Sequence, residues 1–254
     1  MNDRAEYLKR KAFFQSLITL YGRNVVDEIL KDESIEIYTL HLCSSNKDNS
    51  SFEQIAHKRN IEIKYHTKTD LSRISKNAKQ DQGVAIDIMS STYKSIDSLV
   101  ESDLSSGNFI ALDGINNPQN LGLIIRSCAA SKIDGIILGR QKSAKISPLV
   151  MKASAGTLFK MPIYYCAQLL PSLEKLKLQG WSIVTLDSHA TSSLDALKDA
   201  SRSIFVLGSE SDGVSSEIKS LSSMSVSIPM NRGVESLNVA VTAALIAFKV
   251  GSCD

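Results

Sequence analysis

The sequence predicts an α/β protein of two domains, the second built on a mostly parallel sheet. Three observations support this prediction. Strand-like and helix-like segments alternate along residues 1–90, whereas residues 91–107 are rich in Ser, Asp and Lys. From residue 108 onward, short apolar runs recur with helical segments between them. We therefore place an N-terminal domain at 1–90, a linker at 91–107 and a C-terminal domain at 108–254.

The first domain is a compact α/β unit by its periodicity. Residues 17–30 predict an amphipathic helix, because Val25, Val26, Ile29 and Leu30 recur at helical spacing. The remaining expected elements are strands at 35–40, 61–63 and 84–88 and a helix at 52–59.

The second domain contains five apolar runs that are short enough to be strands. They occupy residues 109–112, 135–138, 182–186, 204–207 and 225–228. Because helical segments lie between them, we expect a parallel sheet covered by helices on both faces.

Composition excludes several classes of protein. No run approaches the roughly 18 apolar residues of a membrane span, and the N-terminus lacks a secretory apolar segment, so we expect a cytoplasmic protein without a membrane partner. The four cysteines and four histidines show no metal-ligand spacing, and we predict neither a disulfide nor a metal site. The net charge of +2 is too small to indicate nucleic acid by itself.

The first motif of interest is Asn120-x-Gly122-x-x-x-Arg126, at the start of a predicted helix that follows a polar loop. Arg126 shares a helix face with Gly122, Ala129 and Ala130, and such small residues permit close approach of another chain or a ligand. Taken alone, a surface arginine on an amphipathic helix is the simpler interpretation.

The second motif is Gly208-x-Glu210-x-x-Gly213, directly after a predicted strand. Loops at the carboxyl ends of parallel strands are where ligands bind in open α/β sheets. The segment has no Gly-x-Gly-x-x-Gly pattern, and its carboxylates would repel a pyrophosphate. An ordinary polar turn explains these residues equally well.

The third motif runs from Ile228-Pro229-Met230 to Ser236-Leu237-Asn238-Val239, ahead of a long apolar helix that ends near Phe248. Ser236 is a candidate cap for that helix. Asn238 lies in the first turn of an otherwise apolar helix, which indicates a buried polar network.

In this order and spacing, the three motifs closely resemble those of the SPOUT-class RNA 2′-O-ribose methyltransferases of the TrmH-like family. The resemblance covers residues 108–250, and Lys152-Ala153-Ser154-Ala155-Gly156 is similar to a small-residue segment of that family. The stretches 20–26 and 82–85 resemble parts of the ribosomal-protein-like RNA-binding domain of many members. Departures from the family pattern are Asp81 in place of a common His, Ser211 in place of Gly, and Ser131-Lys132 in place of Phe-Gly.

The resemblance implies a deep trefoil knot in the C-terminal domain and S-adenosylmethionine as the cofactor. It also implies a homodimer in which Arg126 or nearby groups of the partner complete each active site. The implied reaction is methylation of a ribose 2′-hydroxyl in structured RNA rather than DNA, with a guanosine of large-subunit ribosomal RNA as the favoured target. Transfer RNA is the closest alternative, followed by a non-catalytic ribosome-assembly factor. A nucleotide-dependent metabolic enzyme is disfavoured by the missing glycine-rich fingerprint.

The resemblance also implies the roles of individual residues. The catalytic set is Arg126, Asn120, Glu210, Ser236 and Asn238, and the cofactor-binding set is Leu207, Gly208, Ile228, Met230 and Leu237. Since a guanidinium is almost never deprotonated in proteins, we expect Arg126 to bind a phosphate and stabilise the developing alkoxide. In the first domain, Arg73, Lys76 and Lys79 beside Arg23 form either a phosphate-binding patch or a solvated helix end.

Overall fold

The computed structural model describes residues 6–7, 13–14, 17–46, 48–194 and 201–250. The chain divides into two compact units, residues 1–91 with 146–148 and residues 92–145 with 149–254. Within the described ranges, no helix is both long and apolar enough to cross a membrane. Cys43, Cys128 and Cys166 are buried free thiols, and Cys253 lies outside the described residues.

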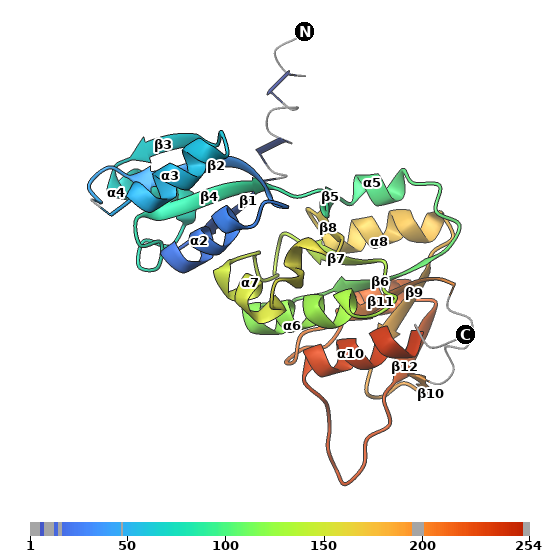
Figure 1. Cartoon of the computed structure of the whole chain (residues 1–254). Coiled ribbons are helices and arrows are strands. Elements are labelled where there is room, and N and C mark those ends of the chain that lie inside the picture. The colour runs from blue at the N-terminus through green and yellow to red at the C-terminus, as the bar shows by residue number, and fades with distance from the viewer. Residues whose placement is uncertain (1–5, 8–12, 15–16, 47, 195–200, 251–254) are drawn as a thin grey trace. The chain divides into compact units, whose positions relative to one another are not determined.

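In the part of the first unit that the structure describes from residue 17 onward, a four-stranded sheet packs with helices α2, α3 and α4 (Figure 1). The strand order is β1-β4-β2-β3, with only β2 and β3 parallel. The buried aliphatic side chains of the sheet, among them Leu20, Leu40 and Ile86, form its core. The elements are β1 (Ile18–Tyr21), α2 (Arg23–Lys31), β2 (Glu36–Cys43), α3 (Ser50–Lys58), β3 (Glu62–His66), α4 (Lys68–Ser75) and β4 (Val84–Met89).

The predicted helix at 17–30 is wrong in its first third. Residues 18–21 form β1, which pairs antiparallel with β4, and the helix begins only at Arg23. Gly22 lies between the two elements with φ 94°, a conformation that favours glycine and breaks the helix. The helical spacing of Val25 to Leu30 is confirmed, since Val26, Ile29 and Leu30 are the buried residues of α2.

The second unit contains an eight-stranded sheet of order β10-β12-β9-β11-β6-β7-β8-β5, in which every neighbouring pair is parallel. The prediction of a parallel sheet is therefore confirmed. Its strands are β5 (Tyr93–Ser95), β6 (Gly107–Leu112), β7 (Gly135–Gly139), β8 (Ile163–Cys166), β9 (Ser182–Leu186), β10 (Ser192–Ser193), β11 (Arg202–Leu207) and β12 (Met224–Ser227).

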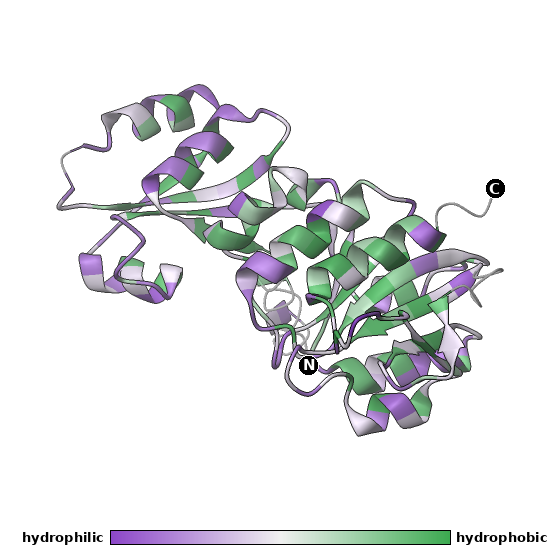
Figure 2. Ribbon diagram, turned by 90° about the horizontal axis from the view of Figure 1, so that it is seen from below, coloured by the Kyte–Doolittle hydropathy of each residue, from purple (hydrophilic) through white to green (hydrophobic). Residues whose placement is uncertain are grey.

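Helices cover both faces of this sheet. Residues of α5, α8 and α9 share one apolar core with Phe109, Ile183 and Val206, whereas α6 and α10 pack against each other on the opposite side (Figure 1). The strands and the inward helix faces are hydrophobic, as Figure 2 shows. The helices are α5 (Asp97–Val100), α6 (Pro118–Ala129), α7 (Pro148–Ser154), α8 (Leu169–Leu178), α9 (Ser216–Leu221) and α10 (Val239–Val250), with a short 3-10 helix at Thr157–Phe159.

The segment predicted as a linker is partly regular structure. Residues 93–95 form β5, which pairs in parallel with β8 at the edge of the large sheet, and α5 follows. The side chains of Ile96 and Leu99 are buried in the core of the second unit. The composition of residues 91–107 did not indicate the strand, because the segment has few bulky residues.

Candidate active site

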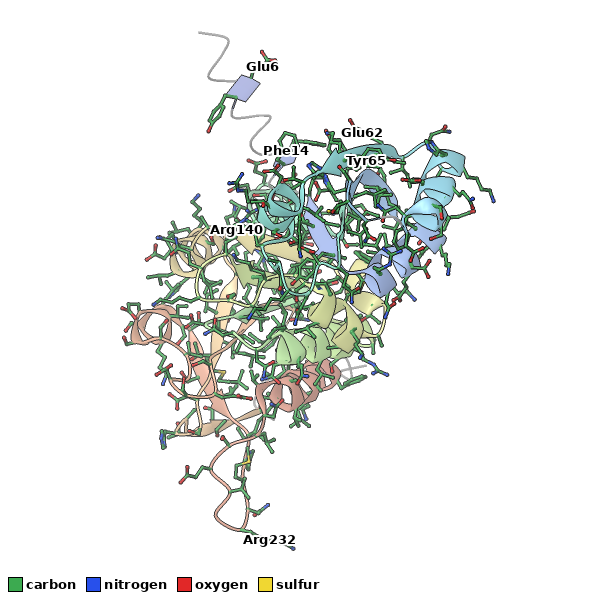
Figure 3. All side chains as sticks on the ribbon, turned by 90° about the vertical axis from the view of Figure 1, so that its left-hand side faces the viewer. Glu6, Phe14, Glu62, Tyr65, Arg140 and Arg232 are labelled. Carbon is green, nitrogen blue, oxygen red and sulfur yellow. The ribbon has the colours of Figure 1, made fainter. Side chains whose placement is uncertain are left out.

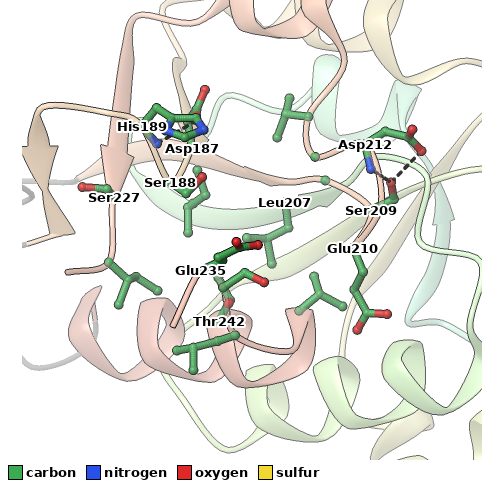
Figure 4. A pocket seen from close by; sticks show the side chains of 18 of the residues that line it. Asp187, Ser188, His189, Leu207, Ser209, Glu210, Asp212, Ser227, Glu235 and Thr242 are labelled. Atoms are coloured by element: carbon green, nitrogen blue, oxygen red, sulfur yellow. Dashed lines mark hydrogen bonds between the residues drawn. The ribbon is translucent and has the colours of Figure 1, made fainter. Parts of the chain in front are cut away.

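The larger cavity of the second unit lies at the carboxyl ends of β9, β11 and β12, beside α10 (Figure 4). Its volume is about 420 Å³, within the range that is usual for small-molecule sites. Parallel strands bring their carboxyl ends to one edge of the sheet, so three loops that are distant in sequence meet there.

All five residues predicted to bind the cofactor line this cavity. Leu207 and Gly208 come from the end of β11, Ile228 and Met230 from the segment after β12, and Leu237 from the approach to α10. Val226 and Val239 add further apolar wall, while carboxylates of Asp187, Glu210, Asp212 and Glu235 are placed around it. The lining therefore combines apolar surface for a flat ring with negative charge for a cation.

Gly208 is required by the fold of its own loop. A Cβ atom at this position would lie 1.9 Å from the carbonyl carbon of Gly213, and 2.1 Å from the backbone nitrogen of Val214. The loop from Gly208 to Gly213 turns back on itself, with Gly213 N donating to Ser209 O at 3.0 Å. The missing side chain of Gly208 is therefore needed for the loop to close on itself.

Asn120, Glu210 and Asn238 meet in one hydrogen-bonded cluster. Oε1 of Glu210 accepts from Nδ2 of Asn120 at 3.0 Å and from Nδ2 of Asn238 at 2.8 Å. Nδ2 of Asn238 also lies 3.2 Å from Oδ1 of Asn120. One residue of each of the three sequence motifs is therefore present. The polar network predicted around Asn238 exists, but the prediction that it is buried is wrong for Asn238 and Glu210, whose side chains are exposed, and Asn120 alone of the three is buried. We refer to these three residues as the amide–carboxylate cluster.

A smaller cavity of about 240 Å³ adjoins the larger one. Its wall is formed by Asn116 and Asn117 of the loop before α6 and by Asn120 in the first turn of that helix. The two cavities share Ser209, Glu210, Ser211 and Val239, so the amide–carboxylate cluster lies at their common boundary. Such an arrangement can hold two ligands side by side with Glu210 between them.

The cap of α10 differs from the prediction. The helix begins at Val239, and Oδ1 of Asn238 accepts a hydrogen bond from Ala240 N at 2.9 Å. Asn238 thus caps the helix with its oxygen and holds Glu210 with its nitrogen. Ser236, predicted as a candidate cap, precedes this turn and instead lines the larger cavity.

Arg126 lies apart from the other predicted catalytic residues. It is exposed, lines neither cavity, and follows Asn120 by six residues on α6, which places it about 9 Å along the helix axis. Gly122 does receive a close approach, but from α7 of the same chain. A Cβ there would lie 2.4 Å from Ala153 Cβ.

The sequence did not predict that Asp187 and Lys219 line the larger cavity. Asp187, directly after β9, accepts a hydrogen bond from Lys219 Nζ at 2.7 Å and a backbone bond from His189 N at 3.0 Å. These contacts, the Lys219 bond foremost, hold the pKa of Asp187 below its usual value. Its position after a strand of a parallel sheet was the available signal.

In the first unit, two of the four basic residues considered for phosphate binding form ion pairs. The guanidinium of Arg23 lies over the ring of Phe52 at 4.7 Å and bonds Asp48, while Arg73 forms an ion pair with Asp70 at 2.9 Å. Arg23 is therefore held within the fold. Lys76 and Lys79 are exposed.

Comparison with known families assigns both units. The model of the SpoU rRNA Methylase family matches residues 107–248. The chain belongs to the SpoU rRNA methylase family. Residues 19–94 match a second model, described as RNA 2′-O ribose methyltransferase substrate binding. The TrmH-like resemblance seen in the motifs is thereby confirmed, and the protein is an RNA methyltransferase by family.

Relatives and solved structures agree with this assignment. A protein of Mycolicibacterium smegmatis named as a tRNA/rRNA methyltransferase is 31% identical over 234 residues, covering 90% of this chain and 74% of its own length. The SpoU methyltransferase AviRb of Streptomyces viridochromogenes has the same fold, with a TM-score of 0.66 at 19% identity over 95% of this chain and 91% of its own. An AdoMet-bound rRNA methyltransferase of Sinorhizobium meliloti gives a TM-score of 0.66 at 21% identity, over 95% and 89%.

Proposed function

We propose that this SpoU-family protein transfers a methyl group from S-adenosylmethionine to a ribose 2′-hydroxyl of structured RNA, most specifically to a guanosine of large-subunit ribosomal RNA. The observation that carries the proposal is the pair of adjoining cavities with the amide–carboxylate cluster at their boundary. One cavity fits a cofactor, the other a nucleotide, and the match of residues 19–94 to a ribose methyltransferase substrate-binding model supports the ribose as acceptor.

The chemistry of the larger cavity fits S-adenosylmethionine. Leu207, Ile228 and Leu237 offer apolar walls to the adenine ring, and the four carboxylates favour a sulfonium cation over an anionic cofactor. AviRb has also been solved in complex with AdoMet, which supports the same cofactor here. When bound, this cofactor supplies an already activated methyl group, so positioning of the acceptor accounts for much of the catalysis.

The cluster residues position the acceptor. Oε1 of Glu210 is occupied by two amides, which fixes the plane of the carboxylate and leaves Oε2 to orient a ribose hydroxyl. Ser236, in the lining of the larger cavity, adds a hydroxyl that can bond the cofactor or the ribose. A positive group near the acceptor oxygen is also needed, because the hydroxyl loses its proton during transfer.

Arg126 of a second copy of the chain is our candidate for that positive group. Its guanidinium lies outside the cavities of its own chain, on the exposed side of α6 with Leu123. On the neighbouring α10, Val241, Leu245 and Phe248 are 49%, 42% and 54% exposed at positions that share one helix face. An apolar face around a cation fits a homodimer in which each Arg126 binds a phosphate in the partner's site.

Methyl transfer to total ribosomal and transfer RNA, followed by nucleoside analysis, tests the reaction and the substrate class. We expect label in 2′-O-methylguanosine from the large-subunit ribosomal RNA and none from transfer RNA. Label in a base would refute the ribose as acceptor, and label in transfer RNA alone would refute the ribosomal assignment.

Mixing two inactive variants tests the partner's arginine. Arg126→Ala and Glu210→Ala chains are each expected to lose at least 100-fold in rate, a loss typical of removing one transition-state group. Co-refolded together, they form heterodimers in which one site has both residues intact, and activity returns. If Arg126 acted within its own chain, the mixture would stay inactive.

A further inference from the structure

The carboxyl edge of the large sheet is divided by charge. Carboxylates surround the larger cavity, at the ends of β9 and β11 and before α10. On the other side, residues 135–173 contain five Lys or Arg residues and no Asp or Glu. Three of these cations, Arg140, Lys142 and Lys145, lie in the loop that follows β7, and all three are exposed. We call these three residues the basic track.

The basic track is attached to the site. β7 lies beside β6 in parallel, so the loop after β7 and the loop after β6 leave the same edge of the sheet. The two loops are joined by a hydrogen bond of 2.7 Å from Ala144 N to Ile115 O. Ile115 lines the smaller cavity, and the residue that donates to it, Ala144, is buried between the track's lysines.

The charge of Lys142 reaches the elements of the site. The pKa of Glu217, at the start of α9, is lowered first by its own backbone hydrogen bond, then by Ser216 and also by the charge of Lys142. The charge of Lys142 therefore acts at the start of α9. No described residue forms an ion pair with Lys142 or Lys145, so both ammonium groups are available to an anion.

Arg140 is held in a stack of planar groups. Its guanidinium lies 4.1 Å from the ring centroid of Tyr165, and that ring stacks on Tyr93 at 4.7 Å with an interplanar angle of 29°. Its backbone N donates to Cys166 O at 2.8 Å, and Figure 3 shows its place on the ribbon. This stack fixes the plane of the Arg140 guanidinium and places its positive charge at the start of the basic track.

We propose that the basic track binds the RNA phosphates that flank the acceptor nucleotide, so that the strand reaches the smaller cavity from the β7 side of the sheet. This inference rests on the proposed function and adds a direction of approach to it. The carboxylates of the larger cavity repel phosphates, and the track attracts them, so the two sides together admit the strand in one orientation.

The test uses the full-length protein with Lys142→Glu and Lys145→Glu combined. Lys175→Glu on α8, also an exposed lysine in the second unit, is the matched single-charge control. RNA binding is measured by fluorescence anisotropy over a series of salt concentrations, with ribosomal RNA fragments as the probe. S-adenosylmethionine binding is measured by calorimetry on the same samples.

We expect the double variant to bind RNA about tenfold or more weakly, with a salt slope reduced by about one for each lysine removed. The control variant and cofactor binding stay at the wild-type values. The KM for RNA rises while kcat is kept, because the track acts on binding alone. Arg140→Lys, which keeps the charge and loses the stacked fork, gives an intermediate loss.

An unchanged salt slope in the double variant overturns the inference. Circular dichroism and cofactor binding verify that the variant is folded, and if glutamate at either position disturbs the loop, Lys142→Gln with Lys145→Gln gives the same measurement. Should wild-type protein fail to label any ribose, the proposed function fails, while the anisotropy data still decide whether the track binds RNA.

Discussion

The side chain of Asn238 makes two hydrogen bonds with different functions. Its oxygen accepts from Ala240 N at the start of α10, and its nitrogen donates to Glu210. An aspartate would satisfy the helix but would place a second carboxylate against Glu210, and a serine would satisfy the helix without reaching Glu210. An amide is therefore required at this position, because it both accepts from Ala240 N and donates to Glu210.

Replacing Asn238 by Ala is expected to lower the free energy of unfolding by about 1–3 kcal/mol, because a cap and a hydrogen bond to a carboxylate are both lost. Methyl transfer should fall as Glu210 loses its fixed orientation. Urea denaturation measures the first effect and initial rates the second. Ser236→Ala is the comparison, since Ser236 caps nothing, and its stability should stay within about 0.5 kcal/mol of wild type. Equal losses in both variants would contradict the assignment of the cap.

The histidines of the first unit predict a dependence of stability on pH. His41 is buried, with Nε2 at 3.0 Å from Asp87 Oδ2 and Nδ1 at 3.0 Å from His66 Nε2. Burial, first, and then the charge of His41 lower the pKa of His66, with Lys64 adding to the shift and Asp70 opposing it. The folded state thus takes up a proton on His66 less readily than the unfolded chain does.

His66 therefore makes its full contribution to the free energy of unfolding above a pH of about 6.5, the pKa of histidine in the unfolded chain. That contribution is lost as the pH falls below this value. We expect the melting temperature to drop between about pH 7.5 and about pH 5.5, and His66→Gln to show a smaller drop. Scanning calorimetry at both pH values makes the comparison. An identical drop in the variant would show that other groups cause the effect.

At the scale of elements, Gly122 determines how closely α6 and α7 pack. Besides the contact with Ala153, a Cβ at this position would lie 2.8 Å from Val150 O and 3.0 Å from Ser154 N. Backbone atoms cannot move away as a flexible side chain can, so a larger residue here must separate the helices. Since α6 carries Asn120 into the cluster, its placement decides the geometry at Glu210.

Gly122→Ala is therefore expected to cost about 1–3 kcal/mol of stability, the usual range for overpacking. Combining it with Ala153→Gly removes one of the clashing atoms and should recover part of the loss. Gly156→Ala provides a control. No atom lies within 4 Å of a Cβ added at this position, so the only expected cost is the backbone strain of an alanine at φ 78°. Full stability in Gly122→Ala would mean that α7 can shift freely.

Periodicity and motifs predicted most elements of the second unit but not its edges. The five apolar runs became β6, β7, β9, β11 and β12, none of which lies at an edge of the sheet. β6, β7 and β11 are largely buried, whereas in β12 only Val226 is buried. The missed strands β5, β8 and β10 have Tyr, Lys or Ser at positions that only pairing with a neighbour makes strand-like. That pairing depends on the neighbouring strands and cannot be predicted from the local sequence.

The functional site was likewise predictable only in part. Motif residues in loops after strands were predictable, since the strand positions place them at one edge. The Asp187–Lys219 pair was not, because its members are 32 residues apart and neither resembles a motif. The position of Arg126 outside the cavities agrees with the role in a partner's site that the family resemblance implied, although helical spacing alone does not show what a helix face contacts.

For the whole molecule, the exposed apolar face of α10 predicts association. Leu245→Glu would bury a charge in the proposed dimer interface, which costs far more than an exposed charge does. We expect a monomer in analytical ultracentrifugation that still binds the cofactor and has lost methyl transfer, because Arg126 of the partner is missing. Leu178→Glu on α8, where the leucine is 89% exposed, is the control and should remain dimeric and active. An active monomeric variant would refute the dimer as the catalytic unit.

Strand β5 limits where the two units of this chain can be separated by recombination. The substrate-binding family match ends at residue 94, inside β5, although that strand pairs with β8 of the methyltransferase sheet. A recombination that joined a new leading module at residue 107 would strip the sheet of its last strand and leave the backbone groups of β8 open to pairing with foreign chains. We therefore expect exchange of modules to be tolerated upstream of residue 92, because the methyltransferase unit is longer than residues 107–248, the stretch that its family model matches.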